Sequence, residues 1–283
     1  MTATSASSGV LRYRALAHAL WTLRTPSFFE EVRPVERAVP YRARAPRGVA
    51  PLADVYAPRR EGAGVSVVLV HGGGFVVGSR DMKPMRFLAS SLTAAGVGVC
   101  TVDYRLVFRG GRIDEAVDDV RAALTFWREH APRYGLDAAR VSLVGLSAGA
   151  TLAMLAASQE QALHRLVCVF GLYDPTHLAG PLAQIVPRLV FRTGERDAWR
   201  RRSPVGSPQP RVPTLLLHGT ADGLVPVEQA RRLAAQREAQ GLPTRLVVYP
   251  DAPHGFFNYP SAVAGQAAEE IARHVLGQPL DRA

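Results

Sequence analysis

Lysine is almost missing from this chain of 283 residues. Of its 34 basic residues only Lys83 is a lysine, and all the others are arginine. The formal net charge of +10 would suit an anionic partner such as nucleic acid or a membrane surface. However, the arginines are spread along the whole chain, and the densest run, 200–202, has no aromatic residue within it on which a base could stack. The pattern indicates a composition bias, and we expect no nucleic-acid partner.

Cysteine and long apolar runs are also scarce. Cys100 and Cys168 each lie in an apolar run typical of a buried strand, so we expect reduced core residues. No stretch of about 18 apolar residues is present, as a membrane-spanning helix would need. The first residues lack a basic region, and Arg12, Arg14 and Arg24 interrupt the apolar run behind them, which argues against a secretory signal. We therefore predict a cytoplasmic protein.

Strand and helix patterns alternate from residue 35 onward. The predicted strands are 35–43, 52–57, 65–71, 97–103, 141–146, 166–170, 214–218 and 244–249. The predicted helices between and after them are 82–95, 113–134, 148–159, 227–240 and 264–275. This order predicts an α/β fold with a mostly parallel eight-stranded sheet and helices on both faces. The first two strands precede any such helix, so we expect them to pair antiparallel at one edge.

The chain divides into an N-terminal segment and one main domain. Residues 1–34 hold a tail and a predicted helix over 9–24, whose apolar stripe suits either a cap over the site or packing on the domain surface. Residues 35–283 form the main domain. Within it, the proline-rich segment 171–212 breaks the alternation and predicts an excursion from the sheet, with a short helix at 182–190.

The sequence Gly-Leu-Ser-Ala-Gly at 145–149 joins a predicted strand to a predicted helix. In that context G-x-S-x-G is typical of a nucleophile elbow, a turn so tight that larger side chains on either side of the serine would collide. The turn would present the Ser147 hydroxyl at the carboxyl edge of the sheet and at a helix N-terminus, where unpaired N–H groups favour a developing oxyanion. The alternative is a glycine-rich turn without catalysis.

The sequence HGGGF at 71–75 follows another predicted strand directly. Its glycines would let the backbone approach a substrate carbonyl closely, since they carry no side chain. The run matches neither a Walker A loop nor a dinucleotide fingerprint. We predict an oxyanion hole formed by backbone N–H groups of Gly72, Gly73, Gly74 and Ala148.

A serine nucleophile needs a base, and the base needs an acid to orient it. His254 follows the strand 244–249 through a short loop, and Asp222 follows the strand 214–218. Both therefore belong to the same sheet edge as Ser147, in the order expected of a serine hydrolase of this architecture. We predict Ser147, Asp222 and His254 as the catalytic triad.

Other residues compete for these roles. Asp174 follows a strand and is the main alternative acid, while Asp251 is close to His254 in sequence. His218 stands at a strand end and is expected to be structural, and His71 is expected to hold the glycine loop.

The motifs HGGGF, VDYRL, GLSAG, HGTADGLVP and APHGFF resemble those of the esterases and lipases related to hormone-sensitive lipase and other carboxylesterases. The resemblance runs from about residue 50 to the C-terminus. It implies an α/β-hydrolase fold with a small cap or lid, hydrolysis of carboxylic esters, and neither a metal nor an organic cofactor. It also implies the same triad and oxyanion hole.

The sequence departs from that family at Leu146, where many relatives carry an acidic residue, and at Ala150, where many carry glycine. We expect the substrate pocket to involve Phe75, Val76, Leu146 and the segment 171–212.

Several functions remain open. Ester hydrolysis of a small molecule is the first hypothesis, and hydrolysis of an amide or peptide bond by the same triad, as in a formamidase or exopeptidase, is the second. A non-catalytic binding protein of the same fold is a third. A lipase associated with a membrane surface is a weaker variant, favoured by the basic charge and the N-terminal apolar stripe. The sequence does not indicate the oligomeric state.

Overall fold

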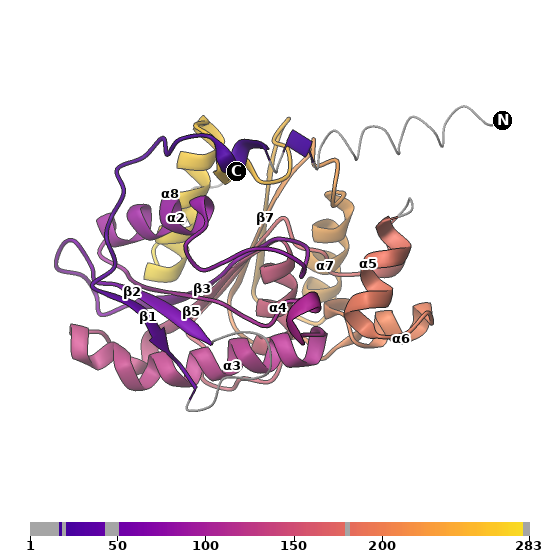
Figure 1. The fold of residues 1–283 in the computed structure, drawn as a ribbon, viewed down its shortest axis with the longest axis horizontal. Coiled ribbons are helices and arrows are strands. Elements are labelled where there is room, and N and C mark those ends of the chain that lie inside the picture. The colour runs from indigo at the N-terminus through magenta and orange to yellow at the C-terminus, as the bar shows by residue number, and fades with distance from the viewer. Residues whose placement is uncertain (1–16, 19–20, 43–50, 179–181, 280–283) are drawn as a thin grey trace.

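The computed structural model describes residues 17–18, 21–42, 51–178 and 182–279. Its strands form one eight-stranded sheet in the order β1-β2-β4-β3-β5-β6-β7-β8 (Figure 1). The strands are β1 (Glu36–Pro40), β2 (Leu52–Tyr56), β3 (Ser66–Val70), β4 (Gly98–Val102), β5 (Val141–Leu146), β6 (Leu166–Val169), β7 (Thr214–Gly219) and β8 (Thr244–Tyr249). The strand β2 pairs antiparallel with β1 and with β4, and all other pairs are parallel. The predicted sheet, with its antiparallel edge, is therefore confirmed.

The central strands are mostly apolar because both faces of the sheet are covered. In β3, Val68 and Val70 belong to one buried cluster, whereas Val67 and Leu69 belong to the cluster on the opposite face. Successive side chains of a strand point to opposite faces, so a strand buried on both sides shows an unbroken apolar run.

Helices supply the two covering layers (Figure 1). The helices α3 (Ile113–His130), α4 (Ala148–Ala157) and α7 (Glu228–Ala239) contribute to the first cluster, on one face. The helices α2 (Lys83–Ala94) and α8 (Ala262–Leu276) contribute to the second, on the other face, and contact each other. The predicted helices on both faces are confirmed.

Differences from the predicted elements have local causes. The helix predicted over 113–134 ends at His130, and a 3-10 turn, Ala131–Tyr134, follows it. Pro132 explains this end, because proline has no N–H to donate to the preceding turn. The short helix predicted at 182–190 is α5 (Leu182–Phe191), and a further helix, α6 (Arg196–Arg201), was not predicted.

The N-terminal helix predicted over 9–24 can be compared only in part. Residues 17–18 and 21–24 are helical, and the rest of 9–24 lies outside the described residues. Among the helices that the structure describes, none is long and apolar enough to cross a bilayer. Cys100 and Cys168 are both buried and free, as expected.

Candidate active site

Ser147 connects β5 to α4 through a strained turn. Its backbone has φ 53° and ψ −118°, a conformation that residues with a side chain rarely adopt. A Cβ atom at Gly145 would overlap the carbonyl oxygen of Gly149, and one at Gly149 would overlap that of Val70. The two glycines are therefore required by close packing of β5, α4 and the end of β3. A larger residue at either position would force these elements apart.

The hydroxyl of Ser147 lies within hydrogen-bonding distance of His254, which in turn contacts Asp222. The distance from Ser147 Oγ to His254 Nε2 is 3.0 Å, and that from His254 Nδ1 to Asp222 Oδ2 is 2.7 Å. A carboxylate only accepts hydrogen bonds, so Nδ1 carries the imidazole proton and Nε2 is left to accept from the hydroxyl. In this tautomer the imidazole can act as a general base toward the serine.

Asp222 is buried and has all of its acceptor positions directed at donors. Its Oδ1 accepts from the backbone N–H groups of Leu224 and Val225, at 2.9 and 2.8 Å. Its Oδ2 lies 3.2 Å from His218 Nε2 in addition to its contact with His254. Burial by itself raises the pKa of Asp222, but the nearby His254 and the hydrogen bonds from both histidines outweigh it and bring the pKa well below its usual value. Asp222 is therefore ionised in the folded protein at neutral pH.

The glycine loop after β3 lies against Ser147. A Cβ atom at Gly72 would be 3.1 Å from that of Ser147. Gly73 has φ 112°, which suits only glycine, and its carbonyl accepts from the two residues that close the loop, Val76 and Val77. In the described part of the chain, the N–H groups of Gly73, Gly74 and Ala148 donate to no carbonyl. These donors are available to a ligand beside Ser147.

His71 supports this loop from the strand side. Its Nδ1 donates to the Gly72 carbonyl at 2.7 Å, and its ring stacks on Tyr104 with centroids 4.3 Å apart. The Tyr104 hydroxyl donates to the His71 carbonyl at 3.1 Å. Burial lowers the pKa of His71, so the ring is neutral and holds the loop without adding a charge.

Comparison with known proteins places this arrangement in a family. The BD-FAE family model matches residues 53–171. An ethyl acetate hydrolase from Pseudomonas putida is 31% identical over 227 residues, covering 71% of this chain and 69% of that protein. The chain belongs to the α/β-hydrolase family of carboxylesterases related to hormone-sensitive lipase.

Other members of the α/β-hydrolase family match over similar regions. Esterase LipC from Mycobacterium tuberculosis is 29% identical over 73% of this chain, and the chain spans 56% of the length of LipC. The structure of a hyperthermophilic esterase from Pyrobaculum calidifontis superimposes with a TM-score of 0.69 at 25% identity, covering 94% of this chain and 91% of that one.

The rival acids of this α/β-hydrolase lie elsewhere. Asp174 accepts hydrogen bonds from Thr176 and contacts His177 at 2.8 Å, and it makes no contact with His254. Asp251 is exposed, and its backbone N–H donates to a threonine side chain. Among the predicted residues, the structure therefore brings Asp222 to His254 and leaves both alternatives apart from it.

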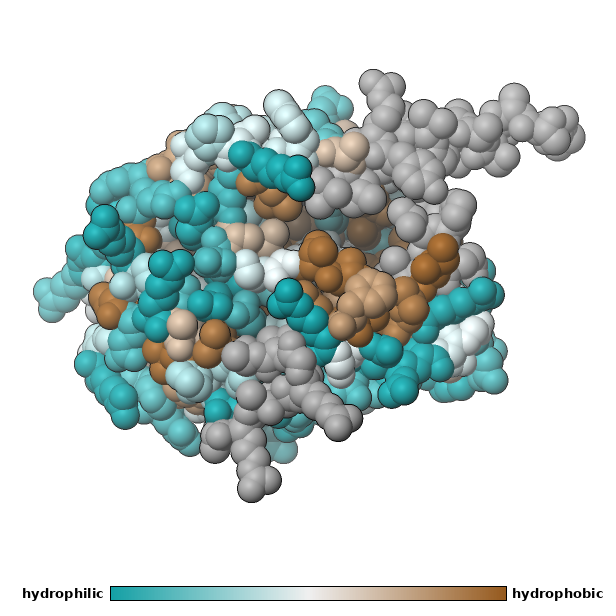
Figure 2. Space-filling view, viewed as in Figure 1, coloured by the Kyte–Doolittle hydropathy of each residue, from teal (hydrophilic) through white to brown (hydrophobic). Residues whose placement is uncertain are grey.

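The predicted pocket residues occupy different environments. Phe75 is buried with φ 67°, Val76 is half-buried, and Leu146 is buried in the cluster under α2 and α8. In Figure 2, apolar side chains gather on the surface near the position that α5 holds in Figure 1, and Ile185 on α5 is 52% exposed. Phe170, which was not among the predicted site residues, has its ring centroid 4.7 Å from that of His254. Its position at the end of a predicted strand on the same edge was an available signal.

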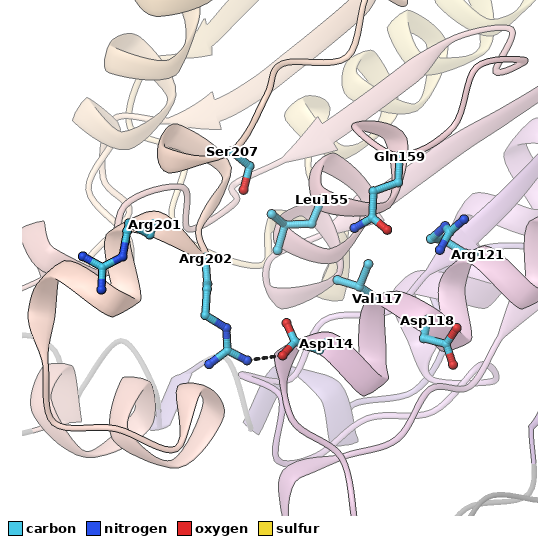
Figure 3. A pocket seen from close by; sticks show the side chains of 9 residues that line it. All are labelled: Asp114, Val117, Asp118, Arg121, Leu155, Gln159, Arg201, Arg202 and Ser207. Atoms are coloured by element: carbon cyan, nitrogen blue, oxygen red, sulfur yellow. Dashed lines mark hydrogen bonds and ion pairs between the residues drawn. The ribbon is translucent and has the colours of Figure 1, made fainter.

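A separate surface cleft of about 270 Å³ lies between α3, α4 and the segment after α6 (Figure 3). Charged side chains line much of it, and Arg202 forms an ion pair there with Asp114. Ser147, Asp222 and His254 are not among the residues that line this cleft. Within the described ranges, no group of three histidine, cysteine or acidic side chains is arranged to bind a metal ion.

Proposed function

We propose that the protein is a serine hydrolase that cleaves carboxylic esters through an acyl-enzyme on Ser147. The observation that carries this proposal is the continuous path of hydrogen bonds from Ser147 Oγ through His254 to Asp222. The likeness to an ethyl acetate hydrolase supports an ester as the substrate. The oxyanion-hole assignment is part of the same proposal.

In the acylation step, His254 Nε2 takes the proton of the Ser147 hydroxyl as its oxygen attacks the ester carbonyl. The carbonyl oxygen then carries negative charge, which backbone N–H groups of Gly72, Gly73 or Gly74, together with that of Ala148, would stabilise. Removing one such donor in serine hydrolases costs about 3 kcal/mol of transition-state stabilisation. His254, now protonated and paired with the charged Asp222, gives its proton to the leaving alkoxide.

Deacylation repeats these steps with water. His254 takes a proton from a water molecule while the water oxygen attacks the acyl carbonyl. His254 then returns this proton to Ser147 Oγ as the acid product leaves. No residue changes its overall protonation state in a full cycle. The charge of Asp222 stabilises the imidazolium that forms in each half.

The test is hydrolysis of p-nitrophenyl esters from acetate to palmitate, with Ser147→Ala in parallel. We expect activity on some chain length and a loss of about 10⁴-fold or more in the variant. Absence of activity on every ester, together with cleavage of matched short amides, would favour the amide hypothesis. Failure of a fluorophosphonate to label Ser147 would favour the non-catalytic one.

Further predictions belong to this proposal. They are the division into an N-terminal tail and helix, 1–34, which either caps the site or packs on the domain surface, and a hydrolase domain, 35–283, with its excursion at 171–212. The exposure of Ile185 on α5 supports a role for that excursion in binding apolar acyl groups. The cytoplasmic location and the lining of the pocket by Phe75, Val76 and Leu146 also stay predictions.

A further inference from the structure

Lys83, the only lysine of the chain, occupies an unfavourable position for a cation. It is the first residue of α2 and is only 3% exposed. The positive end of the helix dipole lies there, and within the described ranges Lys83 Nζ hydrogen-bonds to neutral oxygen atoms and not to a carboxylate. Burial lowers the pKa of Lys83, and the nearby Arg86 lowers it further. Placing an ammonium group here costs free energy, which specific contacts must offset.

Three oxygen atoms provide these contacts. Lys83 Nζ donates to the carbonyl of Thr22, to Oγ1 of Thr25 at 2.6 Å and to the carbonyl of Asn258 at 3.1 Å. Three acceptors match the three protons of an ammonium group. Arginine, which replaces lysine everywhere else in this chain, has a planar guanidinium whose donors diverge in one plane. The shape of the site therefore explains why lysine is kept at this position.

The acceptors belong to two segments that are far apart in the sequence. Thr22 and Thr25 lie at the end of the N-terminal helix, whereas Asn258 lies in the turn that follows His254. The backbone N–H of Asn258 donates to the carbonyl of Gly255, the residue directly after His254, at 2.9 Å. Hydrogen bonds therefore connect Lys83 to the loop that carries the base.

Contacts between aromatic rings also connect the N-terminal segment and α2 to the histidine loop. His18 of the N-terminal segment meets Tyr259 edge-on, with centroids 5.8 Å apart. Phe257, in the turn after the base, packs on Phe87 of α2 and on Phe170, which itself contacts His254. The histidine loop is thus held between α2 and the N-terminal segment, with Lys83 Nζ where the two meet.

We propose that Lys83 is a positioning residue, which fixes the histidine loop through Asn258 and ties the N-terminal segment to that loop. The inference rests on the proposed esterase function. Its catalytic effect would come through the geometry of His254, because misplacement of a reacting group by about 1 Å can cost up to 100-fold in rate. Removal of Lys83 would then lower kcat more than it raises KM.

The test is Lys83→Met, which keeps the length of the side chain and removes its three donors. We expect kcat for a short p-nitrophenyl ester to fall about 10-fold or more, with KM changed by less than about 3-fold. The rate of fluorophosphonate labelling of Ser147 should fall with kcat, while circular dichroism stays native. The Lys83→Arg variant should show a similar fall in kcat, because a guanidinium does not fit the three acceptors.

Ser90→Ala is the matched control. Ser90 also lies on α2, and its Oγ donates to the carbonyl of Glu30 in the N-terminal segment at 2.7 Å, with no contact to the histidine loop. We expect Ser90→Ala to lower Tm and to leave kcat unchanged. A Lys83→Met variant that loses stability in the same way but keeps its kcat and labelling rate would overturn the proposal.

A second measurement needs no variant. Reductive methylation keeps the charge of an amine but replaces N–H donors, and besides an α-amino group Lys83 carries the only amine of this chain that it can modify. We expect Lys83 to react far more slowly in the native protein than in denaturant, and kcat to fall in proportion to the dimethylated fraction measured by peptide mass spectrometry. Full kcat after dimethylation of Lys83 would refute the inference. A wild-type protein without ester activity would instead refute the proposed function.

Discussion

Replacing Asp222 by asparagine would keep the size of the side chain and remove its charge. Oδ2 of Asp222 now faces two donors, Nδ1 of His254 at 2.7 Å and Nε2 of His218 at 3.2 Å. The backbone donors of residues 224 and 225 hold the other oxygen, so the amide nitrogen of asparagine would take the position of Oδ2. His254 would then have to present an unprotonated Nδ1 to that amide.

The consequence is a proton on the wrong nitrogen. With Nδ1 unprotonated, Nε2 of His254 carries the proton and can no longer accept from Ser147. The corresponding change in a serine protease lowers kcat by about 10⁴-fold, equivalent to about 5 kcal/mol. We expect a loss of that size for the Asp222→Asn variant on p-nitrophenyl acetate near pH 7.

Asp174→Asn is the matched control, since Asp174 contacts Thr176 and His177 and not His254. It should keep activity within about 3-fold of the wild type, because its side chain acts only on its own turn. Steady-state kinetics of both variants, with Tm measured beside them, provide the comparison. A loss of less than about 10-fold for Asp222→Asn, or a larger loss for Asp174→Asn, would show that the acid has been misassigned.

Three further predictions concern stability and reactivity. Gly149→Ala should lower the free energy of unfolding by about 2 kcal/mol or more in urea titrations, because its Cβ would overlap the Val70 carbonyl; an unchanged midpoint would contradict the described elbow. Burial lowers the pKa of His274 to about 4, so the folded state resists its protonation, and the free energy of unfolding should fall by about 3 kcal/mol as pH drops from about 6.5 to 4. The His274→Gln variant should show a smaller fall over the same range, and an equal fall would contradict this cause. Burial raises the pKa of Cys100 well above its usual value and that of Cys168 to about 12, so neither should react with a thiol reagent before unfolding; rapid reaction in native buffer would refute their burial.

The elements and turns that could be predicted from the sequence are those in which a local residue pattern follows from a local packing constraint. The apolar run of β3 follows from burial on both faces, and the glycines at 145 and 149 follow from close packing around one turn. Strand ends could be ordered along one edge because parallel strands connected by helices point the same way. That was enough to bring Asp222 and His254 together in the prediction, although 32 residues separate them.

Contacts that depend on side-chain reach were not predictable in this way. Lys83 meets Asn258 across 175 residues, and no spacing rule connects the start of one helix with a turn before another. The contact of Phe170 with His254 depends on its φ of 40°, a backbone conformation that the apolar run 166–170 does not reveal. The end of α3 at His130, by contrast, has a local signal, because Pro132 stands two residues later and has no N–H to donate to the preceding turn.

The order of the strands has a consequence for how this protein folds. Ser147 follows β5 in the middle of the sheet, while Asp222 and His254 follow β7 and β8, the last two strands that the structure describes in both the sheet and the chain. Contacts of such long sequence separation form late, because the intervening chain must be ordered first. A chain that ends before β8 would already contain Ser147 and most of the sheet, but it would still lack His254, the proposed proton acceptor. Labelling of Ser147 by an active-site probe during refolding would therefore time the docking of the final strand.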